Sequence, residues 1–168
     1  MKHHTRPMIP PLIISQIKWR KRQIVGMGGY SVVFRVGGVI AKVGRIDGDE
    51  NEIQRLTAER GLSVPVYDYQ QDVELPQAVT RDFCACHGPR KDIAASDDPV
   101  CSCGEPLDVL LMAEATIGED LPLDAEIVRA RVEALCEEFD RAWDNRPANF
   151  ATYDGHTVAL DYGDPYCD

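Results

Sequence analysis

The sequence predicts an α+β fold, and three observations carry that prediction. Runs of β-branched and aromatic residues, broken by glycines, indicate strands over 17–43. Apolar residues recur every three or four positions over 124–142, which is the spacing of an amphipathic helix. The length of 168 residues is that of one domain, or of two small lobes that share a core.

The other elements follow from local patterns along the chain. The sequence indicates a helix over 48–60, strands over 64–69, 78–83 and 108–115, and a closing hairpin over 149–150 and 157–160. Gly37-Gly38 and Asp154-Gly155 are expected to form the turns of two hairpins. Asp124 is the expected N-cap of the long helix.

The charge balance excludes two classes of partner. The chain holds 28 Asp and Glu against 18 Lys and Arg, for a net charge of -10. Binding to nucleic acid or to an anionic membrane surface needs a basic footprint, so neither is expected. The sequence also lacks an apolar run of the ~20 residues that a membrane helix requires, and the first residues show no secretory pattern. We therefore expect a cytoplasmic protein.

A glycine-rich segment, IVGMGGYSVVF, occupies 24–34. Strand patterns flank Gly26, Gly28 and Gly29 on both sides, which favours a hairpin loop rather than the strand-to-helix turn of a dinucleotide fold. Glycines let such a loop approach phosphates with its backbone N–H groups. A plain hairpin turn with extra glycine is the alternative. Ser31 stands where a third glycine would be expected.

One lysine, Lys42, ends an apolar strand. A lysine at a buried position is costly unless it is paired. The helix over 48–60 offers Glu50 and Glu52, and Glu52 is the expected partner because it directly precedes the apolar Ile53. The alternative is a lysine that reaches solvent and a solvated glutamate.

Two further polar groups follow the long helix. Residues 144–149 read DNRPAN, and Asp161 follows an apolar strand in the segment LDYG. Together with the preceding segments they resemble the protein-kinase family over about 24–163. The matching residues occur in the order Gly26 and Gly28, Lys42, Glu52, Asp144, Asn149 and Asp161.

The resemblance implies a fold and an activity. The fold would be a five-stranded antiparallel N-lobe with one helix C, over 1–115, and a reduced C-lobe over 116–168 with one long helix, a catalytic loop and a short hairpin. The activity would be that of an ATP-dependent phosphotransferase of the Ser/Thr kinase type. A protein or a small molecule would supply the hydroxyl group that accepts the phosphate.

The resemblance also implies how ATP would be held. Lys42, held by Glu52, would contact the α- and β-phosphates. Glu114 to Thr116 would lie in the hinge, with their backbone facing adenine, and Asp120 would reach the ribose. The residues expected to cover the phosphates are Gly26, Gly28 and Gly29.

The remaining roles concern phosphoryl transfer. Asp144 would be the catalytic base that accepts the proton of the substrate hydroxyl, and Arg146 would add positive charge. Asn149 and Asp161 would hold Mg²⁺, for which carboxylate and amide oxygens are suitable ligands.

Some positions depart from the family pattern. Ala142-Trp143 replaces the His-Arg pair before the catalytic Asp, and Tyr162 replaces Phe. Only 164–168 follow Gly163, so we expect the substrate-binding half to be missing, and a homodimer or a partner protein would complete it. A nucleotide-binding pseudokinase that acts as an interaction module and a small-molecule kinase are therefore the alternative functions.

Two Cys-x-Cys pairs suggest a metal site. Cys84 and Cys86 are separated by fourteen residues from Cys101 and Cys103. Four thiolates match a structural tetrahedral Zn²⁺ site, and His87 could replace one of them. We expect the metal to join two segments on the far side of the small lobe, away from catalysis. Two disulfides or free thiols are the alternative.

Overall fold

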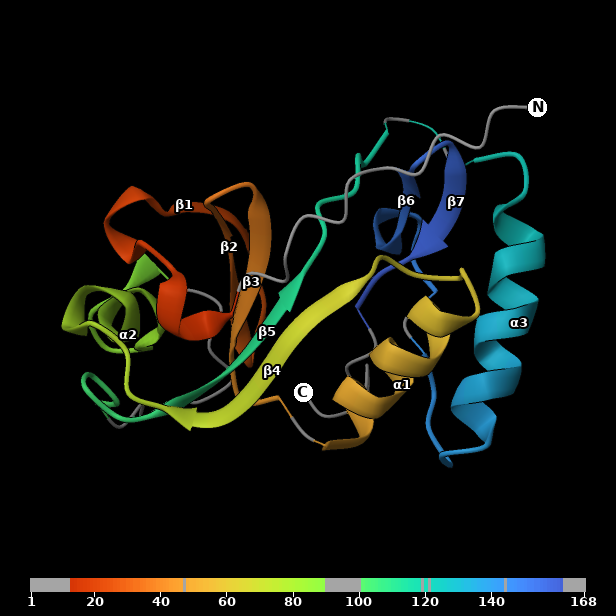
Figure 1. Cartoon of the computed structure of the whole chain (residues 1–168). Helices are drawn as coiled ribbons and strands as arrows, with labels where there is room; N and C mark the ends of the chain where they lie inside the picture. The colour runs from red at the N-terminus through yellow and green to blue at the C-terminus, as the bar shows by residue number, and fades with distance from the viewer. Residues whose placement is uncertain are drawn as a thin grey trace.

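A computed structural model describes residues 13–46, 48–89, 101–118, 120, 122–143 and 145–161. Its centre is a five-stranded antiparallel sheet in the order β1-β2-β3-β5-β4, with a separate two-stranded hairpin, β6-β7 (Figure 1). The strands are β1 (Gln23–Met27), β2 (Ser31–Val36), β3 (Val39–Gly44), β4 (Val66–Val73), β5 (Leu107–Met112), β6 (Phe150–Tyr153) and β7 (His156–Ala159). The helices are α1 (Gly48–Glu59), α2 (Gln77–Phe83) and α3 (Ala125–Glu137). The predicted α+β class and its five-stranded antiparallel sheet are confirmed.

The two predicted tight hairpins both form. Gly37 and Gly38 join β2 to β3 with φ of 59° and 79°, the pair of positive values that a type I′ turn requires. Asp154 and Gly155 join β6 to β7 in the same way, with φ of 51° and 79°.

Other elements pack against both faces of the sheet, although Gln23 and Arg35 on one of these faces are exposed (Figure 1). One face packs against α2 and the first described residues, and its core includes Phe34, Ala41, Val79 and Phe83. The other face packs toward the β6-β7 hairpin, and beyond it α1, α3 and the hairpin share a second core around Ile53. Because side chains alternate along a strand, the residues on either side of Ala41 in β3 point to this second face.

The segment over 78–83 is not the predicted strand but most of helix α2. Pro76 occupies the N-cap position, and Val79 and Phe83 are four residues apart, so both reach the sheet from one side of the helix. A segment of this length carries two apolar positions, which is too few for spacing alone to separate a strand from a helix.

Helix α3 ends at Glu137, five residues earlier than predicted. Asp140 takes a left-handed φ of 54°, and the N–H of Arg141 donates to the carbonyl of Cys136 at 3.1 Å, which closes the helix as a Schellman-type turn. Asp124 does occupy the N-cap position, but its carboxylate accepts the hydroxyl of Thr157 rather than a helix N–H. The expected cap therefore ties the helix to β7.

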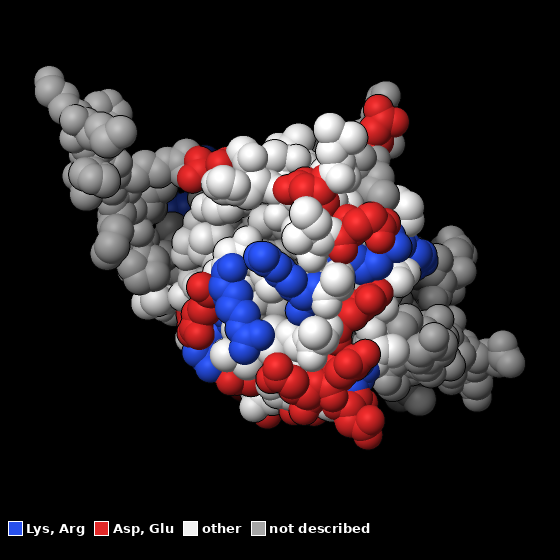
Figure 2. All heavy atoms as spheres, turned by 90° about the vertical axis from the view of Figure 1, so that its right-hand side faces the viewer, with Lys and Arg blue, Asp and Glu red and all other residues white. Residues whose placement is uncertain are grey.

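The outer face of α3 is charged. Figure 2 shows basic and acidic side chains next to one another on the side of the molecule that carries this helix. Glu126 and Arg129, 3.1 Å apart, form one such pair at helical spacing. None of the helices in the described ranges is both long and apolar enough to cross a membrane.

Candidate functional site

A buried lysine forms the centre of the candidate site. Lys42 lies in β3, and its side chain leaves the sheet on the face opposite Ala41 and α2. The residue is 8% exposed. Its Nζ donates to Oε1 of Glu50 and, at 2.9 Å, to Oδ1 of Asp161. Segments that are 119 residues apart in the chain therefore meet at one ammonium group.

The partner of Lys42 on α1 is Glu50, so the prediction of Glu52 was wrong. Glu50 is 6% exposed and shares the inner face of the helix with Ile53 and Gln54. Glu52 lies on the outer face, where both of its carboxylate oxygens accept hydrogen bonds from Arg55 at 2.6 and 3.1 Å. The spacing of three and four residues from Glu50 to Ile53 and Gln54 is the sequence signal that identifies the inward glutamate.

The electrostatics of the cluster favour a charged lysine. Burial alone would lower the pKa of Lys42, but the charges and hydrogen bonds of Asp161 and Glu50 outweigh it and hold that pKa above its ordinary value. Among the described residues, one ammonium group thus faces the two carboxylates of Glu50 and Asp161. A bound cation can neutralise the excess negative charge of these three groups.

Asp161 lies at the open side of this cluster. It follows β7 with a left-handed φ of 57°, and its side chain is 52% exposed, whereas those of Lys42 and Glu50 are 10% and 8% exposed. Its carbonyl accepts the indole N–H of Trp143 at 3.0 Å. Lys42 therefore contacts the carboxylate of Asp161, and Trp143 contacts its backbone carbonyl.

The predicted catalytic loop is described in part. Asp144 lies outside the described residues. Arg146 is exposed, and its carbonyl accepts the N–H of Asn149 at 2.9 Å in a short 3-10 turn. Asn149 is buried, and its carbonyl accepts the N–H of Leu160, the residue before Asp161, at 2.8 Å. The two predicted magnesium ligands, Asn149 and Asp161, thus belong to neighbouring positions at one end of the β6-β7 hairpin.

The glycine-rich segment forms the β1-β2 turn. Gly26 lies in β1 at a register irregularity, Gly28 donates its N–H to the carbonyl of Ser31 at 2.8 Å, and Gly29 follows in the turn. A further glycine, Gly44 at the end of β3, packs closely against the backbone of this turn. A Cβ at Gly44 would lie 2.1 Å from the carbonyl oxygen of Tyr30, so only glycine allows this close approach.

The predicted hinge follows β5, and two of its residues, Glu114 and Thr116, already have hydrogen-bond partners. Glu114 accepts a hydrogen bond from Nε of Arg35 on β2 at 2.6 Å. The N–H and carbonyl of Thr116 pair with Thr152 of β6 at 2.9 and 2.8 Å, so the expectation that its backbone faces adenine was wrong. Within the described part of the chain, the backbone of Ala115 makes no hydrogen bond. Asp120 is exposed.

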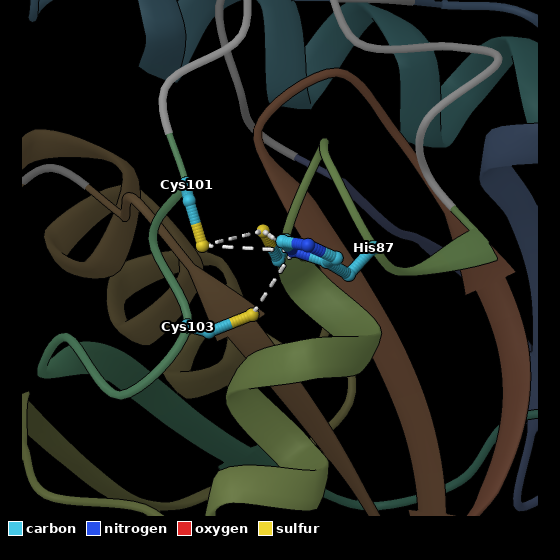
Figure 3. A group of neighbouring side chains, drawn as sticks. His87, Cys101 and Cys103 are labelled. Carbon is cyan, nitrogen blue, oxygen red and sulfur yellow. Dashed lines mark hydrogen bonds between the residues drawn. The ribbon is translucent and has the colours of Figure 1, made fainter.

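A second candidate site lies on the other face of the sheet, where α2 ends. Figure 3 shows His87, Cys101 and Cys103 pointing toward one another, and together with Cys84 their ligand atoms all lie within 4.8 Å of one another. The predicted Cys86 is not part of this group. His87 takes its place because Cys84 and His87 are three residues apart in the turn that follows α2, whereas Cys86 is two residues from Cys84.

The distances in this cluster match tetrahedral coordination. Around one zinc ion, a tetrahedral nitrogen–sulfur pair is about 3.6 Å apart and a sulfur–sulfur pair about 3.8 Å. Nδ1 of His87 lies 3.7, 3.5 and 3.7 Å from the sulfurs of Cys84, Cys101 and Cys103. The sulfurs of Cys84 and Cys101 are 4.0 Å apart. The cluster therefore has the residue types and the spacing to hold a metal ion such as zinc.

The thiols of the cluster also differ in acidity. Although burial opposes it, hydrogen bonds from His87 and from the backbone of Ser102 lower the pKa of Cys84 to about 5. Burial and the neighbouring thiols raise the pKa of Cys103 to about 12. A thiolate disfavours a second thiolate beside it, and a dication removes that penalty.

The segments that carry the four ligand residues make close contacts with helix α2. The N–H of Gly104 donates to Oγ1 of Thr80, a fully buried residue of α2, at 2.8 Å. Gly88 donates its N–H to the carbonyl of Cys84, and a Cβ at Gly88 would lie 2.2 Å from the carbonyl oxygen of Arg81. The two segments that carry the ligands are thus docked on the same helix.

The sequence matches no protein-family model and no curated protein.

Proposed function

We propose that this protein is an ATP-dependent phosphotransferase with a protein-kinase-like arrangement of its nucleotide site. The observation that carries the proposal is the buried Lys42 between Glu50 and Asp161. A lysine fixed by a buried carboxylate presents its remaining donor to a phosphate, and the more exposed carboxylate is available to a magnesium ion. Phosphoryl transfer requires this combination, because it depends on positioning and on neutralising negative charge.

The topology supports the same proposal. Helix α1 connects β3 to β4, so the strand that carries Lys42 is followed directly by the helix that carries its partner. The glycine-rich turn joins β1 to β2 next to this strand. Val33 lies directly across from Lys42 in the β2-β3 register, and Ile40 lies two residues before it on the same face. Both are half-buried and offer an apolar surface on which a purine base can stack.

The proposed reaction uses five residues of this chain. Lys42 binds phosphate oxygens and Glu50 holds its ammonium group in place. Asp161 and Asn149 hold Mg²⁺, which supplies positive charge to the phosphates when it is bound. The oxygen of the acceptor hydroxyl attacks the γ-phosphorus, the bond from that phosphorus to the oxygen of ADP breaks, and the hydroxyl proton passes to Asp144.

The test is transfer of labelled phosphate. The protein is incubated with Mg²⁺ and γ-labelled ATP, alone and with a general protein substrate, beside the Asp144→Ala and Asp161→Ala variants. The proposal predicts transfer or hydrolysis by the natural protein that both variants lose. ATP binding without any turnover above the variants would overturn the enzyme and leave a nucleotide-binding module.

We also propose that the Cys84, His87, Cys101 and Cys103 cluster holds a structural Zn²⁺. Three sulfurs and one imidazole nitrogen fill all four tetrahedral positions, which is typical of structural rather than catalytic zinc. The ion would join the end of α2 to the segment that leads into β5. Metal analysis of reduced protein is expected to give one zinc per chain. Cys103→Ser is expected to lose it, and Cys86→Ser, the matched control, is expected to keep it.

A further inference from the structure

A tryptophan next to the candidate site donates a hydrogen bond to the backbone that follows β7. Trp143 is 6% exposed, and its Nε1–H donates to the carbonyl of Asp161 at 3.0 Å, with a longer contact of 3.4 Å to the carbonyl of Leu160. Indole has this single donor and no acceptor. The donor is therefore directed at the backbone of the two residues that lead out of β7.

The indole ring is fixed from its other side. It meets the ring of Phe150 edge-on, with the centroids 5.4 Å apart and an interplanar angle of 75°. Phe150 in turn lies under the guanidinium of Arg129, 5.8 Å from its ring centroid. Trp143 also belongs to the core that joins α1, α3 and the hairpin. Packing thus sets the direction in which the N–H points.

The residue that accepts this hydrogen bond has an unusual backbone. Asp161 has a φ of 57°, in the left-handed region that non-glycine residues adopt uncommonly and Asp more often than most. That conformation carries the Asp161 carboxylate to Nζ of Lys42 at 2.9 Å. The carbonyl is held by Trp143 and the carboxylate by Lys42, so the turn is fixed at both of its polar ends.

We infer that Trp143 is a positioning residue, which holds Asp161 in its left-handed conformation through the indole N–H and so places the carboxylate for magnesium. This inference rests on the proposed function, because the role of Asp161 as a magnesium ligand is part of that proposal. Trp143 also directly precedes Asp144 in the chain. It is therefore bonded covalently to one acidic residue of the proposed reaction and hydrogen-bonded to the other, Asp161.

The decisive variant is Trp143→Phe. It keeps a buried aromatic ring against Phe150 and removes the indole N–H donor together with part of the ring volume. Trp19→Phe is the matched control, since Trp19 makes the same kind of edge-on contact with Phe34, at 6.1 Å, in the other core. Both variants are first checked for folding by urea denaturation.

The first readout is calorimetric binding of ATP with and without Mg²⁺. Trp143→Phe is expected to bind ATP alone within about twofold of the natural protein, while its affinity in Mg²⁺ falls about five- to tenfold, the effect of one lost hydrogen bond. Trp19→Phe is expected to retain the full magnesium effect. An unchanged magnesium effect in Trp143→Phe would overturn the inference.

The second readout needs no nucleotide. The amide of Leu160, which donates to Asn149, is expected to exchange its hydrogen roughly tenfold faster in Trp143→Phe. The amide of Ala159, which donates to Leu62, is expected to exchange as before. If the natural protein binds no nucleotide, the proposed function fails and this exchange pattern still decides the role of Trp143. If the Leu160 amide exchanged equally fast in the natural protein and in Trp143→Phe, that role would be refuted.

Discussion

Replacing the buried carboxylate by an amide tests the lysine cluster directly. Glu50→Gln keeps the shape of the side chain and removes one of the two charges that face Lys42. Breaking a buried ion pair costs ~3–5 kcal/mol when the other charge is left unpaired. Here Lys42 retains Asp161, and the Gln oxygen still accepts a hydrogen bond, so we expect a loss of about 2–3 kcal/mol in the free energy of unfolding.

The matched control is Glu52→Gln on the same helix. The Glu52 side chain is 40% exposed and, among the described residues, pairs only with Arg55, and solvent screens such a pair. Urea denaturation, followed by tryptophan fluorescence, is expected to separate the two variants clearly, with Glu52→Gln close to the natural protein. Equal losses, or a larger loss for Glu52→Gln, would refute the assignment of Glu50 as the partner.

The pH dependence of this difference has a defined sign. The pKa of Lys42 is raised above that of the unfolded chain, about 10.4. Its stabilising contribution is therefore fully present below about pH 10 and is lost as the pH rises further. We expect the difference between Glu50→Gln and the natural protein to stay constant from about pH 7 to 9. A difference that vanishes by pH 8 would contradict a charged lysine in the cluster.

Three further predictions concern the frame around the two sites. Gly44→Ala is expected to cost about 3 kcal/mol or more, because its Cβ would lie 2.1 Å from the carbonyl oxygen of Tyr30, whereas Gly48→Ala, with nothing within 4 Å, is expected to be neutral in the same urea titration. Thr80→Val is expected to cost about 1–2 kcal/mol by leaving the N–H of Gly104 without its acceptor, and equal unfolding midpoints would contradict this. Removing metal with a chelator is expected to lower the melting temperature, and adding zinc is expected to restore it, while an unchanged melting curve would contradict a structural metal.

Local patterns predicted the parts of the fold that depend on neighbours in sequence. The glycine turns, the long helix and the buried strands all follow from spacing and from residue type. The inward glutamate of α1 could also have been predicted, because Glu50 shares a helix face with Ile53 and Gln54. Proximity to the apolar Ile53 suggested Glu52 instead, and on a helix an adjacent residue points about 100° away.

Other features depend on contacts that no local pattern contains. The backbone pairing of Thr116 with Thr152 joins segments 36 residues apart and occupies the backbone groups of Thr116 that were predicted to face adenine. The choice of His87 over Cys86 depends on how the chain turns after α2, and that helix was itself predicted as a strand. The contact from Trp143 to Asp161 likewise requires the hairpin to return to the end of α3.

The central claim is that Lys42, Glu50 and Asp161 form a site for magnesium and ATP, and calorimetric titration with ATP tests it most directly. The natural protein and Asp161→Asn are each titrated with and without Mg²⁺. We predict one ATP per chain, bound at least about tenfold more tightly by the natural protein when Mg²⁺ is present, and no magnesium effect in Asp161→Asn. Absence of binding by the natural protein, or an equal magnesium effect in both proteins, would contradict the claim.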